Sequence, residues 1–516
     1  MGIISCRKIK NDIQYDKSFE DFQQFVNSNL KGHQRISLNF KDCLLSQENV
    51  SELATALSRC ENLSILNIDI QEQKQIGPDE ISKISQGLQQ CTHLQSLIID
   101  IDYCSVDDKG LNNLSLSLEK CTALSYLKLF VRANHLQPQS ATSLGSCLSK
   151  LKKLEHLDLK LSHNAIKDEG LANLCSYLKD CSNLQILTLG LSGLGYTENG
   201  VSFLGSALQN CYQLQILDMD MSNNEIKDLT GLCLGLQNCS NIFHLKMDLN
   251  DSQIGQQAAQ SLGSLIAKLL NLQKLSLILE RNQIGNDGLS NLAQSISQCN
   301  NLSYLYLHLS NNNIGSLGTT ALGQNISKCK NLNDLHLFLS DNMVNMTDLA
   351  NMCSALVEGS ALEHLHLNLK NWNKQYVSEN QNGIFKLEKT TKLRKFSFDL
   401  SNQVFSKEFI SSLGHFLINL SCLSHLSLFF EQQAFYQNNQ IFLYFIQYIL
   451  MLVNFYFQSK IIFIINKQKF SLNKHNQKNG ICMHDIQLKN FNFVYQQAQK
   501  LKKHKIIFCL LNNIFH

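Results

Sequence analysis

The chain has 516 residues and a formal net charge of +3, with 44% hydrophobic and 17% charged residues. A single compact core does not normally grow to this length, so the chain either divides into several domains or stacks repeated units. The small net charge offers no bulk attraction for a polyanion, and no stripe of Lys or Arg runs along the repeats, so nucleic-acid binding is not expected.

Residues 1–32 are mixed and mostly polar, and we expect them to be partly flexible or to cap the rest of the chain. The opening MGIISC is close to a myristoylation pattern, but Cys6 replaces the usual Ser or Thr. The N-terminus is therefore interpreted either as an acylated membrane anchor or as an unmodified segment. An atypical first repeat begins at His33, with Ile36 and Leu38 as its strand positions.

One later stretch, Leu154 to Leu178 (LEHLDLKLSHNAIKDEGLANLCSYL), combines a strand pattern with a helix pattern. Leucines alternate from Leu154 to Leu161, which predicts a strand, and then recur at the helical spacing of three and four residues. So short a unit cannot bury both elements alone and therefore requires copies on either side. Its first leucine recurs at steps of 30 or 31 residues, with one step of 28, as Leu63, Leu94, Leu124, Leu184, Leu214, Ile242, Leu272, Leu302, Leu332, Leu362, Leu393 and Leu423. The array is predicted over residues 33–433, as about fourteen units.

Ten positions after the first leucine, a polar residue recurs inside the bend between strand and helix. Seven repeats carry Asn or Cys at this position, namely Cys104, Asn134, Asn164, Asn224, Asn282, Asn312 and Asn342. These side chains can hydrogen-bond the exposed backbone of their own and neighbouring coils, so we predict a structural ladder.

The repeat resembles the leucine-rich repeat, specifically the ribonuclease-inhibitor-like class with a full helix in each unit. Its best copies are LEHLDLKLSHNAIKDEG, LQKLSLILERNQIGNDG and LSYLYLHLSNNNIGSLG. The resemblance implies an α/β solenoid of horseshoe shape, with a parallel concave sheet and outer helices. The common pattern LxxLxLxxNxL is two residues shorter than the LxxLxLxLxxNxI found here, so the family's curvature does not transfer.

Cysteines occupy a fixed apolar position, three residues before the first leucine of most repeats. The position is filled by Cys60, Cys91, Cys121, Cys181, Cys211, Cys239, Cys299 and Cys329, and by Leu151 in another repeat. Because Leu replaces Cys there in one repeat, the position needs a modest apolar side chain, which a free thiol provides. We therefore predict a reducing, cytoplasmic location, and the spacing of the cysteines matches no zinc site.

After about residue 433 the composition shifts to Phe, Ile, Asn, Lys, Gln and Tyr, and the period is lost. Residues 434–516 are interpreted either as a disordered tail or loose cap, or as translated AT-rich DNA from an incorrect gene model. The apolar segment 441–457 is a candidate for a short membrane span, which Gln447 and Asn454 interrupt.

In such an array, the residues between the strand leucines line the concave face. Three consecutive repeats place aromatic and histidine side chains there, and we predict that these bind a partner protein: Tyr304, Tyr306, His308, His336, Phe338, His364 and His366. Aspartates of the central repeats join the predicted surface, namely Asp218, Asp220 and Asp248. Aromatic side chains with polar edges are typical interface anchors. The alternative is that these residues simply face water. His336 and His366 share a column, but such pairs are more often incidental than metal ligands, and no metal site is predicted.

The sequence contains no phosphate-binding glycine loop, kinase triplet, hydrolase elbow or HExxH motif. We therefore predict a non-enzymatic scaffold that binds another protein and needs no cofactor, with the oligomeric state open. The resemblance implies two alternatives. Related repeat families in protists include kinase-domain proteins, so the chain could be the recognition arm of a larger signalling protein whose catalytic domain is absent here. Repeats of this class also form GTPase-activating proteins, for which Arg132 and Arg281 are the basic candidates.

Overall fold

The computed structural model describes residues 14–359, 361–371, 385, 391–401, 407–431, 460–466 and 506–511. The chain divides into two compact units, which are described separately. Unit 1 is Met1–Ile254 and unit 2 is Gly255–His516.

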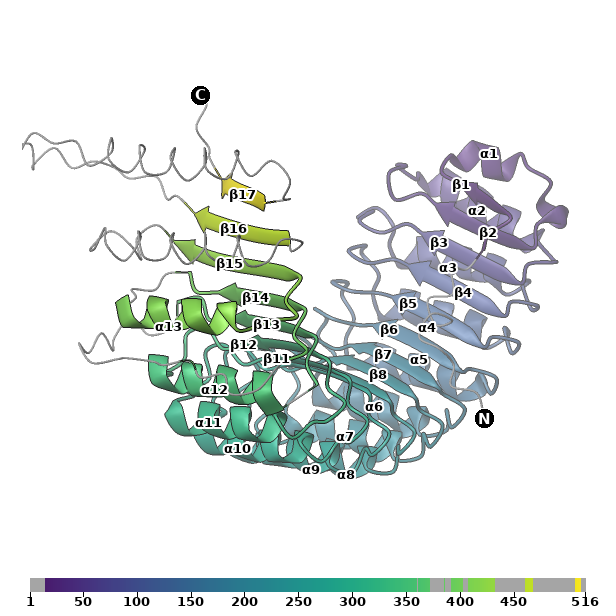
Figure 1. The fold of residues 1–516 in the computed structure, drawn as a ribbon. Coiled ribbons are helices and arrows are strands. Elements are labelled where there is room, and N and C mark those ends of the chain that lie inside the picture. Colours follow the sequence, from purple (N-terminus) through teal and green to yellow (C-terminus); the bar gives the residue numbers. More distant parts are fainter. Residues whose placement is uncertain are drawn as a thin grey trace, which may run out of the picture. The chain divides into compact units, whose positions relative to one another are not determined.

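Unit 1 alternates short parallel strands with helices (Figure 1). Its strands are β1 (Lys17–Phe19), β2 (Arg35–Asn39), β3 (Ile65–Asp69), β4 (Ser96–Asp100), β5 (Tyr126–Phe130), β6 (His156–Lys160), β7 (Ile186–Gly190), β8 (Ile216–Asp220) and β9 (His244–Asp248). Its helices are α1 (Phe22–Val26), α2 (Gln47–Ser58), α3 (Pro78–Leu88), α4 (Asp108–Leu118), α5 (Pro138–Lys150), α6 (Lys167–Leu178), α7 (Glu198–Leu208) and α8 (Thr230–Leu236), with a 3-10 turn at Leu30–Gly32. Each strand pairs in parallel with the next, and α2 to α8 pack side by side on one face of the sheet.

Unit 2 repeats the same arrangement. Its strands are β10 (Lys274–Ile278), β11 (Tyr304–His308), β12 (Asp334–Phe338), β13 (His364–Asn368), β14 (Lys395–Asp399), β15 (His425–Glu431), β16 (Lys460–Asn466) and β17 (Ile506–Leu511). Its helices are α9 (Gln256–Ile266), α10 (Gly285–Ile296), α11 (Ser316–Ile326), α12 (Met346–Gly359) and α13 (Lys407–Ile418). The strands are again parallel. The predicted α/β repeat solenoid, with units of about 30 residues, is therefore confirmed.

The ends of the chain only partly fall within the described residues. In the N-terminal segment, β1 pairs with β2 and the side chains of Phe19 and Phe25 are buried. In the segment 434–516, β16 pairs with β15, and β17 pairs with β16. Gly2 and Cys6, where the sequence leaves acylation open, and the apolar segment 441–457 lie outside the described residues. Among the described residues, no helix has the length and apolar character needed to cross a membrane.

The core lies between the sheet and the helices, where the strand leucines point. Leu157 and Leu159 of β6 are at most 1% exposed, and each aligns with a leucine of β7. The strand is shorter than predicted, because Leu154 and Leu161 lie just outside β6, although both are buried. Alternation inside the strand therefore sets the two faces of the sheet, while the flanking leucines extend the core at both strand ends.

Asn164 shows how the bend after each strand is held. Its side-chain amide donates to the carbonyl of Val131 in the preceding coil (2.9 Å) and to that of Leu161 in its own (2.7 Å). Its oxygen accepts the N–H groups of Asn134 (3.1 Å) and Leu136 (3.2 Å). Side-chain hydrogen bonds from the same position are also made by Cys104, Asn134, Asn224, Asn282, Asn312 and Asn342.

Two ladder residues were missed by the sequence pattern because they are neither Asn nor Cys. Gln73 donates to the carbonyl of Phe40 (2.7 Å) and accepts the N–H of Leu45 (3.1 Å). Ser252 donates to the carbonyl of Met221 (3.3 Å). The longer Gln and the shorter Ser reach the same backbone groups, so the position requires a polar atom rather than one residue type.

The residue before each ladder position adopts a left-handed backbone conformation. Its φ runs from 49° at Ala133 to 64° at Glu72, and eleven repeats share the feature from Glu72 to Asn371. This conformation is unfavourable for residues other than glycine, so the surrounding hydrogen bonds must hold it in place. In one repeat the position is Gly193, and there the ladder residue itself is replaced by the apolar Leu194.

Glycines lie where the helix of the 28-residue repeat packs against its neighbour. This helix, α8, has only seven residues and packs against α7 through bare backbone. A Cβ atom at Gly235 would lie 1.9 Å from the carbonyl oxygen of Gly205, and one at Gly205 would lie 2.2 Å from that of Gly231. No side chain larger than hydrogen fits between these helices.

Candidate partner-binding face

In the five-residue strands, the first, third and fifth residues point away from the helices, and we call this surface the strand face. In β11, β12 and β13 these residues are partly exposed, whereas the residues between them are buried. The predicted binding residues of unit 2 all lie on these three strands. Parallel pairing places Tyr306, His336 and His366 in one row.

The seven predicted aromatic and histidine residues form what we call the aromatic–histidine patch: Tyr304, Tyr306, His308, His336, Phe338, His364 and His366. The ring centroid of His336 lies 5.6 Å from that of Tyr304, 6.0 Å from that of Tyr306 and 5.6 Å from that of His366. That of Phe338 lies 5.1 Å from that of Tyr306, 5.0 Å from that of His308 and 5.2 Å from that of His366. Six rings are therefore in continuous contact across three strands, which makes a preformed surface.

The seventh ring, that of His364, joins through a carboxylate. One oxygen of Asp334 lies 3.0 Å from Nε2 of His336, and the other lies 3.5 Å from Nδ1 of His364. Burial alone would raise the pKa of Asp334, but the hydrogen bonds and charges of these two histidines outweigh it and lower that pKa. Asp334 is therefore a carboxylate at neutral pH. The sequence does not point to it, because an isolated aspartate on a strand has no distinguishing pattern.

A second carboxylate, Glu280, comes after β10 and lies 3.5 Å from Nε2 of His308. Burial lowers the pKa of His308, against the opposing charge of Glu280. Burial, together with the neighbouring His336, also lowers the pKa of His366. The pKa values of both imidazoles therefore lie below the ordinary histidine value, and Glu280 also lies 3.7 Å from Nε of Arg281.

The predicted aspartates lie in unit 1, on β8 and β9. Asp218 pairs with Lys246 at 3.1 Å. Asp220 accepts the N–H of Ser222 at 3.2 Å, and Asp248 accepts that of Asn250 at 3.1 Å. Asp220 and Asp248, at the strand ends, thus each close a local turn. This structural role explains their presence without a binding partner. Their role in binding stays a prediction.

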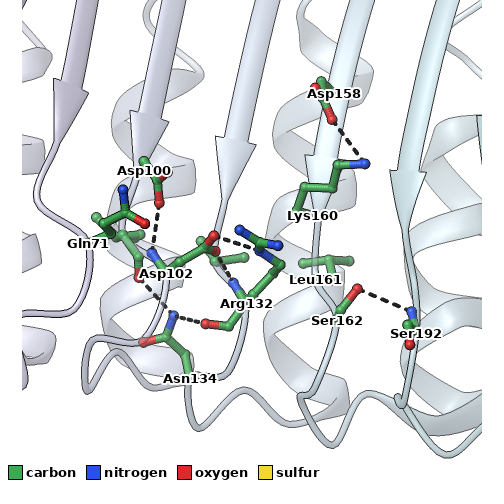
Figure 2. Close-up of polar contacts among 12 residues, drawn as sticks. Gln71, Asp100, Asp102, Arg132, Asn134, Asp158, Lys160, Leu161, Ser162 and Ser192 are labelled. Atoms are coloured by element: carbon green, nitrogen blue, oxygen red, sulfur yellow. Dashed lines mark hydrogen bonds and ion pairs between the residues drawn. The ribbon is translucent and has the colours of Figure 1, made fainter. Parts of the chain in front are cut away.

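A group of polar contacts in unit 1 surrounds Arg132, as Figure 2 shows. The carboxylate of Asp102, whose side chain is 0% exposed, accepts the backbone N–H of Arg132 and lies 2.6 Å from its Nε. Burial raises the pKa of Asp102, although Arg132 opposes the rise. Next to it, burial and the nearby acids Asp102 and Asp69 raise the pKa of Asp100 to about 6. Asp102 anchors Arg132, and no sequence pattern indicates this pair, because no other repeat in the described part of the chain shows it.

On β5 and β6 a lysine sits between an aromatic ring and a carboxylate. Nζ of Lys128 lies 5.7 Å from the ring centroid of Tyr126 and 3.6 Å from Oδ2 of Asp158. Lys160 approaches the other oxygen of Asp158 at 3.6 Å, as Figure 2 also shows. The ring of His156 completes the group, with its centroid 4.2 Å from that of Tyr126.

The described part of the chain shows no metal centre. No group of three or more His, Cys, Asp or Glu side chains there has an arrangement that could hold a metal ion. His336, His366 and Asp334 are close together, but the two histidine rings meet at an interplanar angle of 38° in a ring contact.

Comparison with known proteins identifies no protein-family model and no curated protein that matches this chain.

Proposed function

We propose that this chain is a protein-binding scaffold of the leucine-rich-repeat type, resembling the ribonuclease-inhibitor-like class, and that it binds its partner through the strand face. The observation that carries the proposal is the aromatic–histidine patch, with six rings in contact on three adjacent strands. Rigid aromatic side chains lose little conformational entropy on binding and are the usual energetic anchors of protein interfaces.

The partial exposure of the patch supports a role other than packing. His336 and Asp334 expose 32% and 28% of their side chains, so the patch lies on the surface rather than in the core. Strand leucines on the other face already bury the sheet against the helices, and the fold does not need rings on this side. Truncating an anchor ring in such a patch costs about 1–4 kcal/mol of binding energy.

The experiment is an affinity purification from native cells with the full chain as bait, read by mass spectrometry. The test variant is Tyr304→Ala/Tyr306→Ala/Phe338→Ala. The matched control is Tyr126→Ala, which removes a strand-face tyrosine of unit 1 whose ring also contacts a histidine. A partner retained by the wild type and the control and lost by the triple variant supports the proposal. Equal recovery by all three baits refutes the patch as the binding site.

A further inference from the structure

The stretch of chain that leads into β1 lies against the strand face of unit 1. Nε of Arg35, the first residue of β2, donates to the carbonyl of Gln14. The same nitrogen lies 3.7 Å from Oδ1 of Asp16, and the backbone N–H of Asp16 donates to the carbonyl of Arg35 at 2.7 Å. Because the side chain of Arg35 lies on the strand face, these contacts hold residues 14–16 on that side of the sheet.

Tyr15 shows in which direction this stretch of chain extends. Burial, and then the nearby hydroxyl of Tyr126 on β5, raise the pKa of Tyr15. Along the sheet, β1 and β5 are four strand spacings apart, which is about 19 Å. One tyrosine influences the ionisation of another over about one Debye length, roughly 8–10 Å. Tyr15 therefore reaches across the strand face towards β5 instead of continuing the line of β1.

A hydroxyl in the same row of the strand face lacks a hydrogen-bond partner. Ile65, Ser96 and Tyr126 begin β3, β4 and β5 and lie in register. Oγ of Ser96 is buried and forms no hydrogen bond with any described residue. A buried hydroxyl without a partner is unfavourable. A further segment of chain over this row would supply the missing partner.

Two carboxylates on this face have no cation beside them. Asp69 and Asp100 end β3 and β4 in register. Asp69 accepts the N–H of Gln71 at 3.3 Å, and Asp100 accepts that of Asp102 at 3.1 Å. Neither forms an ion pair with a described residue, whereas Asp102 has Arg132. Burial and the neighbouring acids raise the pKa of Asp100 to about 6, which is the effect of negative charge without a compensating cation.

Residues 1–13 (MGIISCRKIKNDI), which precede the described residues, have the complementary chemistry. They contain three cations, Arg7, Lys8 and Lys10, and one acid, Asp12. They also contain four isoleucines, and the strand face of β3 and β4 has partly exposed isoleucines. Basic and apolar residues in one segment therefore match the carboxylates and apolar side chains of the face.

The length of the segment allows the charges to meet. Lys10 is four residues from Gln14, so an extended chain between them spans about 13 Å. The distance from the first residue of a strand to its fifth is also about 13 Å. A chain that starts from Gln14, beside the first residue of β2, can therefore bring Lys10 to the fifth residues of β3 and β4, which are Asp69 and Asp100.

We propose that residues 1–13 bind the strand face of β2 to β5 in the same chain, with Lys8 or Lys10 paired with Asp69 and Asp100. An external partner has to displace this segment to reach that part of unit 1. The aromatic–histidine patch lies in unit 2, so the inference is independent of the proposed function.

The test is carbodiimide cross-linking of the full chain, with the linked peptides identified by mass spectrometry. Carbodiimide joins an amine directly to a carboxylate, so it reports only pairs that are in contact. Lys109 and Asp79 form an exposed ion pair at 2.8 Å and provide the internal positive control. An equal mixture of isotope-labelled and unlabelled chains distinguishes a link within one chain from a link between two copies.

The test variant is Arg35→Ala, which removes the guanidinium that holds Gln14 and Asp16. The matched control is Lys31→Ala, which removes an exposed cation of the same region that pairs with Glu61. Persistence of the link between Lys109 and Asp79 establishes that each variant is folded around that pair.

We expect links from Lys8 or Lys10 to Asp69 or Asp100 within one chain. Arg35→Ala should lower their yield by roughly three- to ten-fold relative to the positive control, and Lys31→Ala should leave it unchanged. Absence of these links in a wild-type chain that forms the positive-control link overturns the inference. So does an equal yield in Arg35→Ala, and so do links found only between labelled and unlabelled chains, which would assign the segment to a second copy.

Discussion

The buried thiols of unit 1 should make its stability fall steeply at alkaline pH. Burial raises the pKa of Cys91 to about 12 and that of Cys121 to about 11, from an ordinary thiol value of 9.0. Folded protein therefore keeps these protons over a pH range in which the unfolded chain loses them. A raised pKa of this kind stabilises the fold fully below the unfolded value, and the contribution disappears as pH rises from 9 towards 11 or 12.

The size of the effect comes from the linkage relation. One thiol with pKa 9.0 unfolded and about 12 folded costs about 2 kcal/mol of stability at pH 10.5, since each pH unit above 9 costs about 1.4 kcal/mol. Ten cysteines of unit 1 have a raised pKa. These contributions are lost together as pH rises above 9, so the stability of unit 1 should fall steeply between about pH 9 and 11.

The assay records far-UV circular dichroism during alkaline titration, with urea unfolding at fixed pH values to obtain the slope. A Cys91→Ala/Cys121→Ala/Cys211→Ala variant starts less stable at pH 7, but its stability should fall less steeply, by about 4 kcal/mol per pH unit, because three titrating thiols are gone. An identical slope in the wild type and this variant, or an unchanged spectrum up to pH 11, would show that the thiols are not protected by burial.

Three further substitutions test the asparagine ladder, the close packing of α7 and α8, and the ion pair of Arg132 with Asp102. Asn164→Ala should destabilise unit 1 by about 2–4 kcal/mol in urea unfolding, because it leaves buried backbone groups of two coils unpaired; a loss below about 1 kcal/mol would contradict the ladder. Gly235→Ala should cost about 3 kcal/mol or more in the same assay, whereas Gly255→Ala, whose Cβ would meet nothing within 4 Å, should cost less than about 1 kcal/mol. Arg132→Ala should cost about 3–5 kcal/mol at pH 7, because Asp102 is left buried without its cation; the penalty should shrink on acidification as Asp102 takes up a proton, and a penalty independent of pH would refute that cause.

The fold was predictable because its determinants repeat. The strand leucines, the ladder asparagines and the cysteine position each recur at one period, and a repeated pattern reports a buried position even when a single copy is ambiguous. The predictions that were wrong concerned individual residues and the bounds of the strand. The strand proved shorter than the leucine pattern suggested, because Leu154 and Leu161 are buried at its ends without belonging to it. Gln73 was missed because the pattern was read by residue type, whereas the site requires only a polar atom at the right reach.

The candidate site was predictable in position but not in character. Alternation placed the rings of the patch on the strand face, and the register brings Tyr306 next to His336. The carboxylates that lie beside the patch could not be found this way. Asp334 and Glu280 matter through the histidines they meet on neighbouring strands, and such pairs depend on side-chain directions that a periodicity does not contain.

The helix-facing positions were predictable and the chemistry of the strand face was not, and this difference has a physical cause. The same cause determines which substitutions are useful tests. Residues facing the helices are fixed by packing, so leucine recurs there, whereas the strand face has Tyr304, Asp334 and His364 at the same position of three successive strands. Partly exposed positions that contribute little to the core can change their chemistry at small cost in stability. Leucine at Tyr306 and Phe338 should therefore leave the melting temperature nearly unchanged while altering recognition, and it is this separation that allows a loss of binding to be attributed to the surface and not to the fold.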